Sequence, residues 1–422
     1  CVIPNYAKKL KLTETKDRKQ SCGQRAIFVG YNTFPNLMSV LTGMNMSSIY
    51  SACHPNMYSC NELMIWSKFR KAGYTTAYGE DYLRLPDTFF RHNGFKYTPT
   101  HHYMRPFFIT GEQQNGNVIC TGHRSSGKQI LNYAYDFADT YKSQSFFGMF
   151  WINSYSHNLD NLPSLFENDL LNFFEKARES DILNNTFIVF FSDHGIRYGP
   201  MRLLEESYYE ERLPMFFVWV PNEFRTLHKQ EYYNLQLNQN RLVTPYDLYA
   251  TLAKISNMSA NSADITSEAC PSCKNLFEEI TTHRTCAEAG VISKWCSCHD
   301  MKSVDRTIDR DATNSLQLAV SYVQGMANEI QTIDGMKCHS LQLEAVLRTH
   351  AFKGVNKTYY VVAFQMKPGQ VVYETTVLKE NNEYSILDSV DTLTAYNVRG
   401  NCVKNENDRK YCVCKKLNIV RT

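Results

Sequence analysis

The stretch AIFVGYNTFPNLMSVLTG, residues 26–43, joins an apolar run to a helical pattern through a short polar turn. AIFVG (26–30) is the expected strand, and the helix is expected to open at Pro35, where the missing N–H of proline is harmless. A Thr or Asn just before a helix is most often its cap. On these residues alone, Thr33 therefore has two interpretations, a helix cap or a nucleophile at a strand end.

The same alternation of strand and helix patterns continues through the first two-thirds of the chain. Helical patterns occupy 62–73 and 164–179, and the second predicts one buried face made of Leu165, Phe166, Leu170, Phe173, Phe174 and Ala177. YTTAYG reads as a strand, and unbroken apolar runs that suit strands buried on both faces occupy 145–152, 186–191 and 215–220. This alternation predicts an α/β domain over 26–265, with a mostly parallel sheet flanked by helices.

The pattern changes after about residue 265. A cysteine-rich segment (266–300) is followed by a polar linker (301–314) and a region with one helical pattern (315–331). Strand patterns follow at 341–352, 358–366, 370–378 and 384–390. They predict a small α+β domain over 315–422, like a cystatin sheet wrapped on a helix and tied by Cys338, Cys402, Cys412 and Cys414. Residues 1–25 are expected to be irregular and incomplete.

Length and charge narrow the class of protein. The chain has 422 residues, which favours two domains. Its formal net charge is only +3, and no basic stripe with interleaved aromatic residues is present, so we expect no nucleic-acid partner. No run reaches the roughly 18 apolar residues of a membrane span, and we expect no transmembrane segment.

Cysteines and glycosylation sequons indicate an oxidising compartment. The chain has 14 cysteines, and N-x-[ST] sequons occur at Asn45, Asn184, Asn257 and Asn356. We expect a secreted, extracellular glycoprotein with disulfides, whose leader has been removed or omitted, since the sequence begins at Cys1. The alternative is a zinc-stapled module, because CPSC (270–273) is followed by Cys286, Cys296 and Cys298.

Reactive side chains follow three of the expected strands. Asp193 and His194 end FIVFFSDHG, Ser154 and His157 follow the 145–152 run, and Thr33 and Asn36 follow the first run. The carboxyl ends of parallel strands meet at one edge of a sheet, so these groups are expected to face one pocket. Carboxylate and imidazole suit Zn²⁺ and similar ions, and a metal beside Thr33 would favour its alkoxide. In the alternative, Asp193 satisfies loop amides and His157 is an ordinary hydrogen-bonded residue.

Longer motifs carry a resemblance to a known family. NTFPNLMSVLTG resembles the nucleophile segment of the alkaline-phosphatase superfamily, closest to its nucleotide pyrophosphatase/phosphodiesterase branch, and FSDHG resembles that superfamily's Asp-His metal pair. An animal family of extracellular, sulfatase-like proteins of unknown function is similar over about 26–300, in motifs that occur in the expected order: PTHHYMRPFF, SYSHNLDNL, ILNNTFIVFFSDHG, LEESYYEERLPMFF, RLVTPYDLYATL and RTCAEAGVISKWCSC.

The resemblance implies a two-metal site that this chain retains only in part. Thr33 matches the nucleophile, Asn36 an oxyanion donor, and Asp193 with His194 the ligands of the first metal. His157 matches one ligand of the second metal, while Ser154 and Tyr249 stand where an acid and a distant His are expected. In addition, His101 stands where family members tend to carry Asp.

The first metal's other acid is expected upstream of Thr33, and no residue of 1–25 fits it. We therefore expect a degenerate site that holds one divalent ion, zinc or calcium, or none. Two functions remain open. One is an extracellular binding pseudoenzyme, with a partner or a phosphate or sulfate ester as ligand. The other is a metal-dependent hydrolase of such esters with Thr33 as nucleophile.

Overall fold

The structure is a computed structural model, and the residues that it describes are 27–53, 57–83, 85, 95, 97–116, 118–157, 163–204, 206–258, 265–354, 356–394 and 400–416. The expectations for 1–25 lie outside them. The chain divides into two compact units, one comprising Cys1–Gly195 and Arg212–Ser297, the other Ile196–Glu211 and Cys298–Thr422. The domain boundaries drawn from the sequence stay a prediction.

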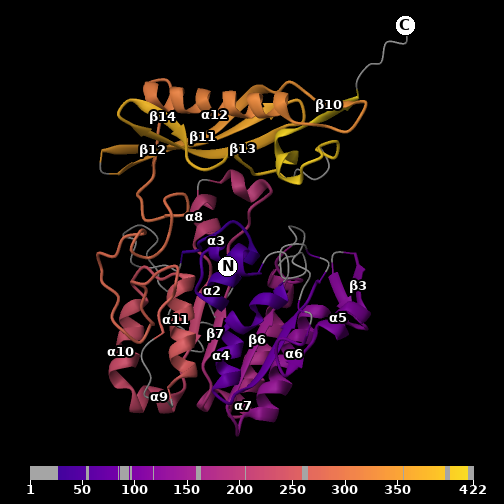
Figure 1. Cartoon of the computed structure of the whole chain (residues 1–422), viewed down its shortest axis with the longest axis vertical. Helices are drawn as coiled ribbons and strands as arrows, with labels where there is room; N and C mark the ends of the chain where they lie inside the picture. Colours follow the sequence, from indigo (N-terminus) through magenta and orange to yellow (C-terminus); the bar gives the residue numbers. More distant parts are fainter. Residues whose placement is uncertain are drawn as a thin grey trace. The chain divides into compact units, whose positions relative to one another are not determined.

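Three parallel strands organise the first unit. β1 (Thr75–Glu80) lies between β2 (His102–Tyr103) and β6 (Phe146–Trp151), and Glu80 is in register with Trp151, so β1 and β6 end together. Successive side chains point to opposite faces of a strand. Tyr78 accordingly packs with α4 (Ile65–Lys71), whereas Gly79 approaches α6 (Ser126–Tyr141). The predicted α/β class, a parallel sheet flanked by helices, is confirmed (Figure 1).

One expectation about the strands is wrong, and one pair of strands departs from the parallel direction. Residues 27–30 form no strand: they are held by two backbone bonds, from Ile27 N to Val243 O and from Phe28 N to Arg212 O. The apolar runs 186–191 and 215–220 contain β7 (Ile188–Phe191) and β8 (Phe216–Trp219), but these strands pair antiparallel. An apolar run indicates burial, not direction, because backbone direction depends on how the chain returns between the two strands.

The helices follow the predicted patterns with shifted starts. Among the described residues, the first helix begins at Thr33, two residues before Pro35. In α7, only Ala177 of the predicted apolar face is fully buried, and the described others are partly exposed. The helices of the first unit include α2 (Thr33–Thr42), α3 (Met46–Cys53), α5 (Arg105–Gly111), α7 (Glu167–Glu179), α9 (Asn222–Leu227), α10 (Lys229–Asn238) and α11 (Pro245–Ser256).

A second, antiparallel sheet lies at the side of α6. It contains β3 (Glu112–Asn115), β4 (Val118–Thr121) and β5 (Arg124–Ser125). Gly122 turns the chain between β4 and β5 with φ of 63°. Since β5 runs directly into Ser126, the hairpin fixes where α6 begins.

The second unit matches the predicted helix on a sheet. Its antiparallel strands run in the order β14 (Glu383–Ile386), β13 (Val371–Glu380), β12 (Lys357–Lys367), β11 (Gln342–Gly354) and β9 (Lys302–Ser303). The single long helix α12 (Arg310–Glu329) lies along one face of this sheet (Figure 1). Its buried stripe Leu316, Ala319, Val323 and Ala327 follows helical spacing and packs on residues of β12 and β13 that include Val362, Phe364 and Tyr373.

A buried ionic cluster anchors residues 196–211 within the second unit. Arg202 is 2% exposed and contacts Glu211 at 2.8 Å and Glu374 of β13 at 3.1 Å. Arg348 of β11 pairs with the other oxygen of Glu374. Each charge has a partner of opposite sign, which a buried ion requires.

Disulfides account for the cysteines that the sequence grouped together. The pairs are Cys53–Cys60, Cys270–Cys273, Cys286–Cys296, Cys338–Cys412 and Cys402–Cys414, and Cys298 is also disulfide-bonded. The zinc alternative for 270–298 is therefore not supported, because a bridged sulfur is not a thiolate ligand. Among the described residues, Cys120 is a free thiol.

Candidate functional site

The turn before α2 is held by the side chain of Asn36. Its oxygen accepts hydrogen bonds from the amides of Val29 (2.9 Å) and Gly30 (3.1 Å), and its nitrogen donates to the carbonyls of Gly30 (2.9 Å) and Asn32 (3.0 Å). Gly30 is needed there because a Cβ would lie 2.5 Å from Pro35 Cβ. Both amide protons of Asn36 are thus engaged. Its predicted oxyanion role would need one of these bonds to break.

Thr33 is the first residue of α2, not its cap. Asn32 takes the cap position in an extended conformation, but its side chain makes no capping hydrogen bond. Thr33 is 6% exposed. The turn therefore places a buried hydroxyl at a helix N-terminus, where an anion would be favoured. Its role as a nucleophile stays a prediction.

The end of β7 approaches this turn. Asp193 and Asn36 line the same small cavity of about 30 Å³, and the rings of Phe28 and His194 meet edge to face at 6.5 Å. His194 Nδ1 is 2.6 Å from the carbonyl oxygen of Gly195, which makes Nδ1 the protonated nitrogen. In the neutral form of the ring Nε2 carries the lone pair, and this atom lies 3.3 Å from Asp193 Oδ2.

The end of β6 contains a hydrogen-bonded network around Asp81. Asp81 Oδ1 accepts from the amides of Asn153 (2.6 Å) and Ser154 (3.2 Å), and Oδ2 accepts from the Ser154 hydroxyl (2.5 Å). Asn153 also donates from its side chain to Glu80 Oε1 at 3.1 Å. Because β1 and β6 are parallel and end together, Asp81 meets the residues that follow β6.

Sequence reasoning missed this acidic group. Glu80, Asp81 and Glu112 are all buried, and Glu112 accepts from the amides of Tyr82 and Leu83. Burial raises the pKa of Asp81 from 3.8 to about 7, although the hydrogen bonds from Ser154 and Asn153 oppose the shift. The available signal was the pair Glu80-Asp81 directly after a predicted strand.

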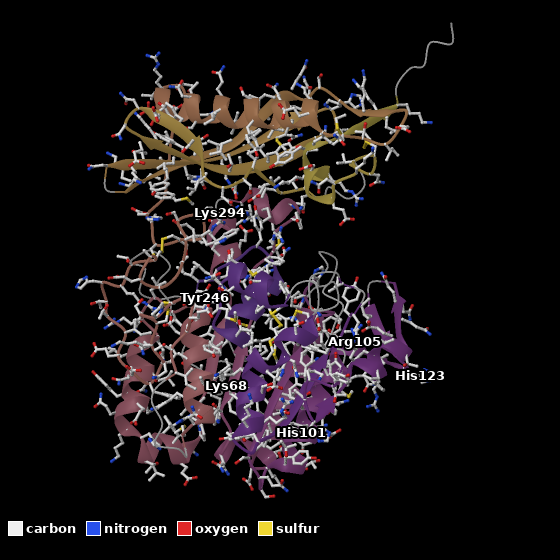
Figure 2. The ribbon with its side chains drawn as sticks, in the orientation of Figure 1. Lys68, His101, Arg105, His123, Tyr246 and Lys294 are labelled. Atoms are coloured by element: carbon white, nitrogen blue, oxygen red, sulfur yellow. A yellow bond between two sulfur atoms is a disulfide. The ribbon has the colours of Figure 1, made fainter. Side chains whose placement is uncertain are left out.

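The other predicted site residues do not all lie at this end of the sheet. His157 lies in the same loop as Ser154, and its ring meets the Tyr82 ring edge to face at 6.2 Å. His101 lies at the opposite end of β1, because its Nδ1 accepts from the Thr76 amide at 3.1 Å (Figure 2). His101 is therefore not part of this edge of the sheet.

Tyr249 belongs to the hydrophobic core. It is 5% exposed, and it packs with Phe34, Met38 and Leu41 of α2. A Cβ at Gly43, which ends α2 with φ of 68°, would lie 2.5 Å from the Tyr249 ring. The side chain that stands at the expected histidine position is thus a packing residue.

Buried cations and aromatic rings lie beside the turn before α2. Lys294 Nζ lies 4.1 Å from the centroid of the Tyr31 ring and 4.8 Å from that of Trp295. Arg212 faces Trp295 at 5.6 Å, and Trp295 packs on Phe28 at 4.9 Å. Lys294 and Trp295 belong to the quoted motif RTCAEAGVISKWCSC, but the motif alone gave them no role.

The described residues fit part of a metal site. A tetrahedral zinc ion with bonds of about 2.0–2.2 Å separates neighbouring ligand atoms by roughly 3.3 Å. That value matches the separation between His194 Nε2 and Asp193 Oδ2, and Oδ2 is buried without a hydrogen bond. However, the described His, Cys, Asp and Glu residues offer no third ligand there: the two groups of three within 4.8 Å consist of cysteines. The arrangement fits two ligands of one ion and no complete site.

The predicted sequons differ in exposure. Asn45, Asn184 and Asn356 are exposed, whereas Asn257 is half-buried. Exposed asparagines are accessible to glycan attachment, and modification itself stays a prediction. Among the described helices, none combines the length and apolarity needed to cross a membrane.

Residues 27–347 match a family described as "Protein of unknown function (DUF229)", which covers more than half of the chain. The chain belongs to this family. A comparison with curated proteins found no match.

Two solved structures are similar to this DUF229 member. One, titled "Crystal structure of Ps i-CgsB", is 14% identical with a TM-score of 0.31, covering 82% of this chain and 77% of its own. The other, titled "Crystal structure of PsFucS1 sulfatase from Pseudoalteromonas sp.", is 13% identical with a TM-score of 0.35, covering 88% and 76%.

Proposed function

We propose that the first unit is an alkaline-phosphatase/sulfatase-like domain whose two-metal site is degenerate, and that the protein acts outside the cell by binding rather than by turnover. The motifs NTFPN and FSDHG, in family order, support this relationship, with the nucleophile segment nearest to the phosphodiesterase branch. Asn36 and Asp193, one residue from each motif, line the same small cavity. The disulfides and sequons support an extracellular location.

One observation carries the binding interpretation. Two of the three positions where ligands of the second metal would stand are occupied by residues with structural roles: Ser154 donates to Asp81, and Tyr249 fills the core against Gly43. Neither side chain offers a charged or imidazole ligand. Since two dications at close range need several carboxylates and imidazoles, this edge of the sheet is poorly equipped for two-metal hydrolysis.

A second function is favoured by the Asp193–His194 pair. The unbonded Asp193 Oδ2 and the facing lone pair of His194 would hold one divalent ion, zinc or calcium, and that ion would supply Lewis-acid activation of a bound ester. Thr33, at the N-terminus of α2, would then present its hydroxyl to a phosphate or sulfate ester. The amide groups at this helix end would hold the anionic group.

The two functions are separated by an assay of the purified full-length chain. Hydrolysis of p-nitrophenyl sulfate, p-nitrophenyl phosphate and bis-p-nitrophenyl phosphate is measured with added zinc, calcium or magnesium, alongside Thr33→Ala. We expect no turnover that depends on Thr33. Hydrolysis that Thr33→Ala abolishes and Thr42→Ala, a change on the same helix, leaves intact would overturn the binding function and establish the hydrolase.

A further inference from the structure

A polar groove of about 820 Å³ lies on the first unit, away from the turn before α2. One wall is formed by the β4–β5 turn and the part of α6 that ends at Asp136, and the other by α7. Its lining residues are His123, Arg124, Ser125, Lys128, Gln129, Asn132, Tyr135, Asp136, Asp169 and Lys176. Figure 2 shows His123 at the outer edge of this part of the molecule. A volume in this range suits a ligand of several rings rather than a single inorganic ion.

The groove has an excess of positive charge. Lys128 and Asp169 pair at 2.7 Å, so they largely neutralise each other. The remaining charged groups are two cations, Arg124 and Lys176, and one anion, Asp136. None of these three forms an ion pair with a described residue. The first turn of α6 contains no acidic residue. The groove therefore favours an anionic ligand.

The rest of the lining suits hydroxyl groups and a ring face. Lys128, Asn132 and Tyr135 recur at helical spacing on α6 and form one strip. The amide of Asn132 and the carboxylate of Asp136 can donate to or accept from hydroxyl groups, while Lys176 lies 5.6 Å from the centroid of the Tyr135 ring. A helix face that is merely solvated has no element facing it. Here Asp169 and Lys176 of α7 face the strip on α6 and form the second wall of the groove.

We propose that this groove binds an acidic oligosaccharide. Arg124 and Lys176 contact its sulfate or carboxylate groups, and Asn132 and Asp136 contact its hydroxyl groups. Nucleic acid is a poorer fit, because single strands bind by stacking successive bases on aromatic side chains, and Tyr135 is the one Phe, Tyr or Trp among the lining residues.

The groove begins next to the network at the end of β6. Tyr155 follows Ser154 and donates its hydroxyl hydrogen to Asp169 Oδ2 at 3.1 Å. A Cβ at Gly127 would lie 2.3 Å from the same ring, so α6 and Tyr155 are in close contact. This proposal adds a ligand class to the proposed binding function, but it does not depend on the metal-site residues.

The test is calorimetric titration of the full-length chain with a size-defined heparin tetrasaccharide. The variant Arg124→Gln/Lys176→Gln removes two cations of the groove. The control Arg178→Gln/Lys229→Gln removes two exposed cations that do not line it. We expect the dissociation constant to rise about tenfold or more in the groove variant and less than about twofold in the control.

Further probes decide the ligand class. Asn132→Ala should weaken tetrasaccharide binding several-fold while circular dichroism shows an unchanged fold, and Thr33→Ala should bind as the wild type does. Equal losses in the groove and control variants would refute the proposal. So would an oligodeoxynucleotide of matched charge, or inorganic sulfate, that binds as tightly as the tetrasaccharide. Ester hydrolysis would contradict the binding-only function but would leave the tetrasaccharide measurements valid. Failure of the proposed function and failure of the groove proposal are therefore distinguishable.

Discussion

The Ser154 hydroxyl donates a hydrogen bond to Asp81 Oδ2 across 2.5 Å, and both residues are buried. Ser154 stands at the position where a metal-ligating acid was expected from the resemblance. The contact shows why an acid would be poorly accommodated there, since it would face the carboxylate of Asp81. The serine completes the set of three donors that this carboxylate accepts.

Asp81 should make the stability of the first unit depend on pH. Burial raises its pKa from 3.8 to about 7, so between these values the folded chain keeps a proton that the unfolded chain has released. This contribution to the free energy of unfolding is present below pH 4 and is lost as the pH rises through 7, by about 4 kcal/mol at most. Asp81→Asn should flatten that decline, as measured by urea unfolding from pH 4 to 8.

Tryptophan fluorescence is the appropriate probe for this measurement. All four tryptophans, Trp66, Trp151, Trp219 and Trp295, lie in the first unit, so their fluorescence reports the unfolding of that unit. Glu175→Gln, a change at an exposed carboxylate on α7, serves as the control and should keep the wild-type slope. If Asp81→Asn also keeps that slope, Asp81 does not titrate as its burial implies.

Restoring an acid at position 154 should damage the fold. Ser154→Asp places two carboxylates in contact in a buried site, and we expect a loss of about 3 kcal/mol or more in the free energy of unfolding near pH 7. Ser154→Ala removes one hydrogen bond to a charged group and should cost about 1.5–3 kcal/mol. Comparison of the two in the same urea titration isolates the charge. A Ser154→Asp protein as stable as Ser154→Ala would show that the site tolerates a second acid.

Restoring a histidine at position 249 should also fail to rebuild a site. The Tyr249 ring is buried in the core against Gly43. Tyr249→His loses apolar contacts and buries a more polar ring, with an expected cost of about 2–4 kcal/mol. Tyr249→Phe keeps the packing and should stay within about 1 kcal/mol of the wild type. Zinc that stabilises Tyr249→His against thermal unfolding, but not Tyr249→Phe, would argue for a surviving second site.

Arg284 should be important for the packing of the cysteine-rich segment. Its guanidinium donates to Asp247 Oδ2 at 2.9 Å and lies 2.8 Å from Cys273 Sγ, and Asp247 is fully buried. Arg284→Met leaves that carboxylate without its cation, so we expect a loss of about 3–5 kcal/mol. The double variant Arg284→Met/Asp247→Asn should recover part of this loss. Additive costs in the double-mutant cycle would exclude a coupled pair.

The regular elements could largely be predicted from the sequence, because burial patterns report local geometry. The hairpin strands of the second unit and the helix before Gly43 follow directly from residue spacing. The strand predicted at 26–30 is absent from the described part, 27–30, because formation of a strand depends on a neighbouring chain. The antiparallel pairing of β7 with β8 could not be read from two apolar runs for the same reason.

The candidate site was predictable only where its residues adjoin in sequence. Asp193 and His194 are consecutive, so their proximity follows from the motif. Asp81 and Ser154 are 73 positions apart, and only the parallel register of β1 with β6 brings them together. Lys294 reaches Tyr31 through the cysteine-rich segment, whose path no periodicity describes.

The bonds of Asn36 have a consequence for inferring activity from sequence. Its side chain satisfies two amides and two carbonyls of residues 29–32, so an alanine there would remove four hydrogen bonds to the main chain at once. Selection for folding alone would then preserve the Gly30–Pro35–Asn36 portion of the segment after catalysis had ceased. A match to this motif therefore indicates an inherited fold. Evidence for a working enzyme must come from residues that the turn does not need.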